Sequence, residues 1–178
     1  DCTLRDGGYY NKWDFDPDIV QSYLQAVAAA GIEYVELGLR NFPKEGFLGP
    51  FAYTTESFIN RLDLPPGPTY GVMVDAKTLL TAGQRIEDAI EALFADATDS
   101  CLGLVRVAAH YGEIGACEAI ARRLKNKGYL VGFNLMQSGG KPGLLITDTA
   151  AMIAGWDAVD TLYFADSLGN MEREEVLR

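Results

Sequence analysis

Short apolar stretches alternate with amphipathic ones along this chain of 178 residues, and this alternation restricts its possible folds more than any other feature. Apolar, β-branched and aromatic content predicts strands at 34–38, 70–75, 104–108, 130–136 and 161–165. Segments with apolar residues at helical spacing lie between them, as at Ile114, Cys117, Ile120, Ala121 and Leu124. Strand ends recur about every 30 residues, the usual length of a βα unit. The sequence therefore predicts an α/β protein with a parallel sheet.

The first ten residues, DCTLRDGGYY, predict one more short strand, from Cys2 to Arg5, and hence about six βα units. We expect this strand to end at Asp6 and to turn through Gly7 and Gly8, because glycine tolerates the backbone angles of a tight turn. A carboxylate at a strand end suits a hard divalent cation, and an adjacent guanidinium can stabilise developing negative charge. The alternative is a surface ion pair between Arg5 and Asp6 that closes the turn.

Two architectures agree with this alternation, an open doubly wound sheet and most of an eightfold barrel. No glycine-rich dinucleotide fingerprint follows the first predicted strand, which weakens the doubly wound option. Periodicity alone leaves both open.

Composition narrows the classes of partner. The net charge of −10 and the pI near 4.5 argue against nucleic acid and anionic membranes as partners. No apolar run is long enough to span a bilayer. The cysteines Cys2, Cys101 and Cys117 lack metal-type spacing and suit a reducing compartment, so we expect a cytoplasmic protein.

Polar side chains gather where the predicted strands end, which is where barrel enzymes carry their chemistry. The candidates are Arg5, Asp6, Glu36, Asp75, His110, Asn134, Gln137, Asp166 and Ser167. Several such groups at one mouth are costly unless they bind a ligand or one another.

Each candidate has a structural alternative. Glu36 either points inward and pairs, for instance with Arg5, or lies on an outer face. His110, the single histidine, is either a structural hydrogen-bonding residue or a functional group at a strand end. Asn134 either faces the barrel interior or is a satisfied core amide, and Ser167 either contacts a ligand or caps a helix. The loop from Leu39 to Tyr53 is a candidate lid.

DCTLRDGGYY, above all Thr3 to Gly7, resembles the first-strand signature of the metal-dependent DRE-type TIM-barrel lyases and synthases, the hydroxymethylglutaryl-CoA lyase-like family. Its members include 4-hydroxy-2-oxovalerate aldolase, which the chain resembles most, together with isopropylmalate and citramalate synthases. The sequence DSLG at 166–169 resembles the ending of strand six in this family. The resemblance implies an incomplete TIM (β/α)8 barrel over 1–178, a partial catalytic domain with about the first six units, cut at both ends.

The resemblance also implies roles for residues. Arg5 would be catalytic, and Asp6 would bind a divalent metal, Mg²⁺ or Mn²⁺. Asp166 and Ser167 would contact substrate or metal-bound water, and Glu36 and Asn134 would serve substrate binding. Many aldolases of the family have a basic histidine shortly after Arg-Asp-Gly, where this chain has Gly8 and Tyr9, so Tyr9 or His110 would have to act as the base. The family's His-x-His metal motif does not occur in the chain.

The resulting hypothesis is a divalent-metal-dependent carbon–carbon lyase of the aldolase type, with a pyruvate carboxyltransferase-like domain. It would cleave a small 2-oxo or hydroxy acid through a metal-stabilised enolate. The alternatives are a Claisen-type synthase that condenses an acyl-CoA, and a non-catalytic binding domain on the same fold. We expect a homo-oligomer at full length.

Overall fold

The computed structural model describes residues 1–177 and contains a five-stranded parallel sheet. Its strands are β1 (Tyr34–Leu39), β2 (Thr69–Asp75), β3 (Leu104–His110), β4 (Leu130–Met136) and β5 (Thr161–Phe164). They lie side by side in chain order, and every neighbouring pair is parallel. A doubly wound sheet reverses its strand order at a switch point, so these strands do not form one. The sheet is open rather than closed into a barrel.

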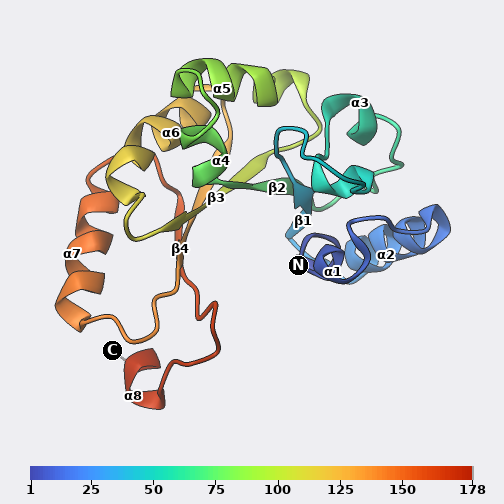
Figure 1. Cartoon of the computed structure of the whole chain (residues 1–178). Coiled ribbons are helices and arrows are strands. Elements are labelled where there is room, and N and C mark those ends of the chain that lie inside the picture. The colour runs from blue at the N-terminus through green and yellow to red at the C-terminus, as the bar shows by residue number, and fades with distance from the viewer. Residues whose placement is uncertain (178) are drawn as a thin grey trace.

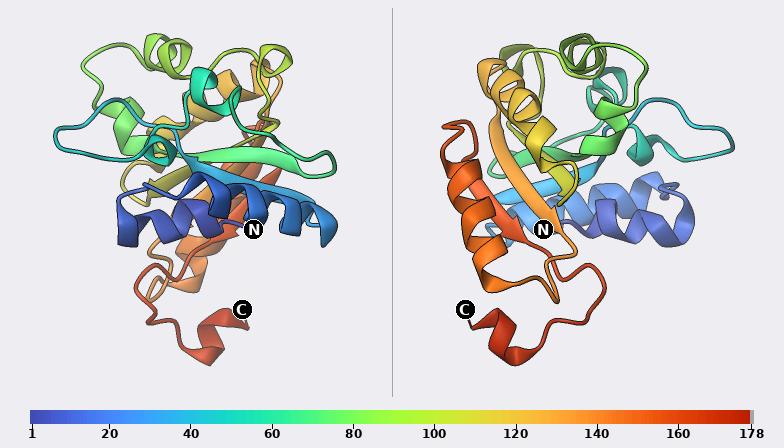
Figure 2. Two further views of the ribbon diagram at one scale, coloured as in Figure 1. Left: turned by 90° about the vertical axis from the view of Figure 1, so that its right-hand side faces the viewer. Right: turned by 60° about the vertical axis from the view of Figure 1, so that its left-hand side comes forward.

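The helices lie mainly on one side of this sheet (Figure 1). They are α1 (Thr3–Asn11), α2 (Pro17–Ala29), α3 (Glu56–Ile59), α4 (Ala76–Leu80), α5 (Ile86–Leu93), α6 (Ile114–Asn126), α7 (Gly143–Ala154) and α8 (Arg173–Val176), with 3-10 turns at Pro50–Ala52 and Ala97–Asp99. Figure 2 shows α6 and α7 along the twisted sheet, while α1 and α2 lie beside β1. The covered face of the sheet is fully buried and apolar at Val72, Val74, Val105, Val107, Val131, Phe133 and Leu135.

The opposite face, which we call the inner face, carries Glu36, Arg106, Asn134 and Tyr163. Tyr163 is 40% exposed there, so this side of the sheet is open to solvent at β5. Because side chains alternate between the faces of a strand, the polar residues on the inner face are separated from the apolar core beneath the helices.

The predicted first strand, Cys2 to Arg5, is wrong: α1 occupies this segment, and the sheet has five strands rather than six. Only Asp1 pairs with β1. Its terminal ammonium donates to the Tyr34 carbonyl at 2.7 Å, and the Glu36 amide donates to the Asp1 carbonyl at 2.8 Å. The chain then turns into the helix, which places Arg5 beside β1.

The predicted turn at Gly7 and Gly8 is also absent, because both glycines lie inside α1. Glycine is a poor helix former, so tertiary contacts must support this helix. Trp13 folds back over it, and its indole Nε1 donates to the Arg5 carbonyl at 2.9 Å. A Cβ at Gly8 would lie 2.0 Å from Trp13 Cδ1, so the second glycine gives the indole room to approach the helix.

Most of the remaining predicted elements are present, and some have different bounds. Asp16 caps α2, accepting from the amides of Asp18 and Ile19, as the Asp-Pro-Asp sequence predicts. The sequence also predicts a helix over 54–62 and a helix cap at Thr147 or Asp148, but the helix at the first position is limited to α3, and α7 begins at Gly143. The sequence predicts a further helix from Glu172 onward, which is α8 in the structure, and Arg178 lies outside the described residues. No helix within 1–177 combines the length and the apolar character that crossing a bilayer requires.

Candidate functional site

Two arginines converge on one buried carboxylate on the inner face. Glu36 is 6% exposed, and its Oε1 accepts from Arg5 Nε at 2.6 Å. Arg106 donates two parallel hydrogen bonds to the same carboxylate, from Nε to Oε2 at 2.7 Å and from Nη2 to Oε1 at 2.6 Å. Of the two orientations considered for Glu36, the structure has the inward one, paired with Arg5. Two guanidiniums on one carboxylate leave this buried group with a net positive charge.

Strand register explains how β1 and β3 meet across β2. Glu36 is opposite Gly71 on β2, and Gly71 is opposite Leu104, two residues before Arg106 on the same face of β3. Arg106 itself is opposite Met73, and its long side chain reaches back across β2 to Glu36. A Cβ at Gly71 would come within 2.8 Å of the Leu104 carbonyl oxygen.

A cleft of about 430 Å³ opens at the carboxyl ends of β2, β3 and β4. Asp75, Ala108, His110 and Met136 line it from the sheet, together with Lys44, Lys77, Thr78, Thr81 and Glu113 from the loops and α4. Ligands of parallel α/β proteins bind outside the carboxyl ends of the strands, so this is the expected position for a small-molecule site.

Asp75 is a carboxylic acid of the cleft with a raised pKa. Burial raises the pKa of its carboxyl, the charge of Lys44 opposes this rise, and that of Glu113 adds to it. His110 and Arg5 lower the same pKa to a smaller extent. Asp75 therefore lies within electrostatic reach of both the cleft and the arginine pair.

Tyr9, on α1, lies within electrostatic reach of both Asp75 and Arg5. Burial raises the pKa of its phenol, and the charge of Asp75 raises it further. The charge of Arg5 lowers this pKa. The tyrosine ring also packs edge-on against Trp13, with ring centroids 4.7 Å apart. Tyr9, Arg5 and Asp75 thus form the link between the cleft and the inner face.

His110 lines the cleft, and its imidazole has no hydrogen-bond partner among residues 1–177. Its backbone amide donates to Glu113 Oε2 at 2.9 Å, which fixes the start of the following turn. Asn134 lies on the inner face of β4, in register with Ala108 of the cleft. The roles of His110 in catalysis and of Asn134 in substrate binding stay predictions.

Asp6 is the carboxylate expected to bind metal. Its side chain is 67% exposed, and Oδ1 accepts from Arg5 Nη1 at 2.8 Å. Over 1–177, no group of three or more His, Cys, Asp or Glu side chains is arranged to hold a metal ion. Asp6 thus offers a single carboxylate beside a guanidinium.

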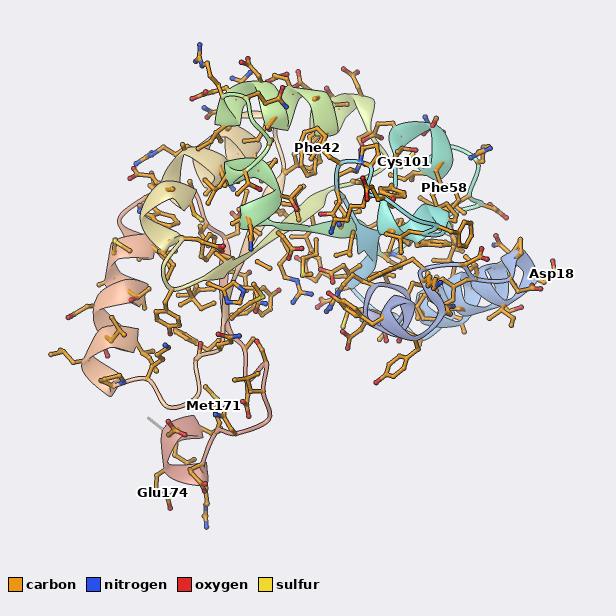
Figure 3. All side chains as sticks on the ribbon, in the orientation of Figure 1. Asp18, Phe42, Phe58, Cys101, Met171 and Glu174 are labelled. Carbon is orange, nitrogen blue, oxygen red and sulfur yellow. The ribbon has the colours of Figure 1, made fainter. Side chains whose placement is uncertain are left out.

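Asp166 and Ser167 have structural hydrogen bonds in the loops after the strands. Asp166 accepts from the amides of Asn170 and Met171 at 2.9 and 3.0 Å, and these bonds lower the pKa of its exposed carboxyl. Ser167 Oγ accepts from the Gln137 amide at 3.1 Å. Figure 3 labels Met171 on the segment that leads to α8, apart from α1. Within the described part of the chain, no hydrogen bond or ion pair joins Asp166 or Ser167 to Arg5, Asp75 or His110.

Sequence reasoning overlooked Arg106. The signal was available in LVRVAAH, where Arg106, Ala108 and His110 alternate with apolar residues and therefore share one face of the strand. A charged residue inside an otherwise apolar strand needs a partner, and Glu36 is a charge of opposite sign inside another predicted strand.

Among solved structures, the chain is similar to the "N-terminal domain of a putative aldolase from Bacteroides vulgatus", with a TM-score of 0.77 and 27% sequence identity. The similarity covers 99% of this chain and 56% of that one, so the chain spans about half the length of its structural neighbour. No protein-family model matches the chain, and no curated protein matches it. The fold is aldolase-like.

Proposed function

We propose that the protein is a carbon–carbon lyase of the aldolase type that cleaves a small 2-oxo or hydroxy acid through an enolate. The observation that carries the proposal is the fixed guanidinium of Arg5. Glu36 holds it within electrostatic reach of Asp75, which lines the cleft together with His110, and the carboxyl and imidazole of these two residues can move protons. The similarity to an aldolase-like structure supports the same reaction class.

Each step of such a cleavage has a candidate residue. The substrate hydroxyl must lose a proton as the carbon–carbon bond breaks, and the bonding electrons move onto the oxygen of the adjacent 2-oxo group. Arg5 would donate hydrogen bonds to this developing enolate oxygen, whose charge increases in the transition state. His110 would accept the hydroxyl proton, because it is the histidine of the cleft.

Tyr9 suits the opposite role. A phenol whose pKa is raised by burial and by Asp75 stays protonated at neutral pH. It would therefore donate a proton to the enolate carbon after cleavage, rather than act as the base. Its position within electrostatic reach of Arg5 would keep the phenol near the oxygen that the guanidinium holds.

A divalent ion, Mg²⁺ or Mn²⁺, is part of the proposal. The exposed carboxylate of Asp6 fits such an ion as one ligand, because Oδ2 has no hydrogen-bond partner among residues 1–177 and hard cations prefer carboxylate oxygens. When bound, the ion would act as a Lewis acid on the substrate oxygens.

The test is turnover of a 4-hydroxy-2-oxo acid by the intact protein with Mg²⁺ or Mn²⁺, followed as release of the 2-oxo acid product. Arg5→Lys keeps the charge but cannot reproduce the geometry of the guanidinium donors, so turnover should fall by about 100-fold or more. The matched control is Arg122→Lys, which alters an exposed pair with Glu118 and should leave turnover unchanged.

Melting temperature and Mn²⁺ affinity are measured beside turnover. Lost turnover in a folded, metal-binding Arg5→Lys protein supports the lyase. Near-normal turnover would refute the role of Arg5. A wild-type protein that condenses an acyl-CoA, or that binds a 2-oxo acid without cleaving it, would instead identify a synthase or a binding domain.

A further inference from the structure

We infer that Arg106 is a positioning residue for catalysis, one that fixes the guanidinium of Arg5 through the carboxylate they share. The inference rests on the proposed function and extends it to Arg106, which lies on β3. Strand β2 separates β3 from β1, the strand that carries Glu36. Its basis is the shared atom: Glu36 Oε1 accepts from Arg5 Nε and from Arg106 Nη2, both at 2.6 Å.

The orientation of Arg5 depends on Glu36. The Arg5 backbone is anchored by the indole of Trp13, but its side chain crosses from α1 to the sheet. Asp6, its other carboxylate partner, is exposed, and an ion pair in water contributes little to the fixing of a side chain. The Glu36 contact is largely buried, with the two side chains 12% and 7% exposed, so it sets the direction of the guanidinium.

Glu36 in turn depends on Arg106. A single bond from Arg5 would leave Oε2 without a partner and would let the carboxylate rotate. Two N–H donors of the Arg106 guanidinium bind both carboxylate oxygens at once, which fixes the plane of the carboxylate. A lysine provides a point charge and cannot replace this pair of parallel hydrogen bonds.

Arg106 is itself held in place. Its guanidinium lies over the ring of Tyr163, 5.5 Å from the centroid. Gly132, directly opposite on β4, leaves room for this stack, because a Cβ there would lie 3.4 Å from Arg106 Cγ and 3.2 Å from Tyr163 Cε2. Residues of β4 and β5 thus orient Arg106 on β3, and its hydrogen bonds to Glu36 connect it to Arg5 on α1.

The substitution Arg106→Met keeps an unbranched side chain of similar length to the aliphatic part of arginine. It removes the guanidinium and its two hydrogen bonds to Glu36. Turnover should fall by about 10- to 100-fold, as is usual when a residue that orients a catalytic group is lost, while KM changes little. Arg106→Lys keeps the charge near Glu36, and turnover should stay low. Full activity of Arg106→Lys would overturn the inference, because charge alone would then suffice.

The decisive measurement is a double-mutant cycle with Arg5→Lys. If Arg106 acts through Arg5, the double variant loses about as much turnover as Arg5→Lys alone. Losses that multiply would show two independent contributions and would overturn the inference.

A second readout needs no activity and therefore separates this inference from the proposed function. The Nε–H signal of Arg5 in ¹⁵N NMR should be protected from exchange with water in the wild type. It should lose that protection in Arg106→Met and keep it in Arg122→Met, the exposed control. Unchanged protection in folded Arg106→Met would refute the positioning of Arg5, whatever reaction the protein catalyses.

Discussion

Replacing Glu36 by glutamine tests the centre of the site through stability alone. Glutamine has nearly the same shape, so the change leaves no cavity. It removes the negative charge that three hydrogen bonds from Arg5 and Arg106 share. One side-chain oxygen can still accept, but the amide nitrogen that replaces the other oxygen faces a guanidinium donor.

The magnitude follows from burial. Removing one partner of a buried ion pair costs about 3–5 kcal/mol, because the remaining charge is stranded. Here the stranded guanidiniums are 12% and 15% exposed on the inner face, so each can turn partly toward water. We therefore expect a loss of about 2–4 kcal/mol in the free energy of unfolding, or roughly 5–15 °C in melting temperature for a chain of this size.

The assay is urea unfolding followed by circular dichroism, with calorimetry for the melting temperature. Glu118→Gln is the control, since it breaks an exposed pair with Arg122 and should change stability by at most about 0.5 kcal/mol. Adding Arg106→Met to Glu36→Gln should restore part of the loss, because it removes one stranded cation. A loss below about 1 kcal/mol for Glu36→Gln, or no recovery in the double variant, would refute this account of the pair.

Three further predictions concern metal binding by Asp6, the pH dependence of stability at Asp75 and the reactivity of Cys117. Asp6→Asn should weaken Mn²⁺ binding about tenfold or more in calorimetry, or about 1.4 kcal/mol, and unchanged affinity would remove Asp6 from the metal ligands. The raised pKa of Asp75 means that its contribution to stability is full below its ordinary pKa of 3.8 and is lost as the pH rises through the raised value. Asp75→Asn should therefore gain stability relative to wild type between acid and neutral pH, and a difference independent of pH in thermal melts would contradict this. Burial raises the pKa of Cys117 to about 12, so Cys117 should resist a thiol reagent in the native protein at pH 8 while exposed Cys101 reacts, as mass spectrometry of the labelled protein can show.

Local sequence determined most of the fold. The strand at 130–136 was predicted with its observed bounds, and Asp16 was identified as the cap of α2, because these features depend on neighbouring residues. The segment from Cys2 to Arg5 was mistaken for a strand because its helix depends on Trp13, which closes over Gly8. Local propensity carries no information about that contact.

The site was predictable only in part, for a related reason. The pairing of Glu36 with Arg5 was one of two expected orientations, and the structure confirms it. The contact with Arg106 spans 70 residues and passes over Gly71, so it depends on the register of three strands. Periodicity places a residue on a face but does not fix the register between strands.

The two glycines of the inner face show how a buried charge cluster fits on a sheet. Glycine within a strand usually weakens it, since it offers no side chain to pack and loses more backbone entropy on folding. Gly71 nevertheless lies where Arg106 reaches across β2, and Gly132 lies where Arg106 stacks on Tyr163. A larger residue at either position would meet its neighbours at 3.2 Å or less. These strands therefore give up local packing at the two positions through which the arginine is oriented, which is the compromise expected where a sheet supports a functional group rather than a core.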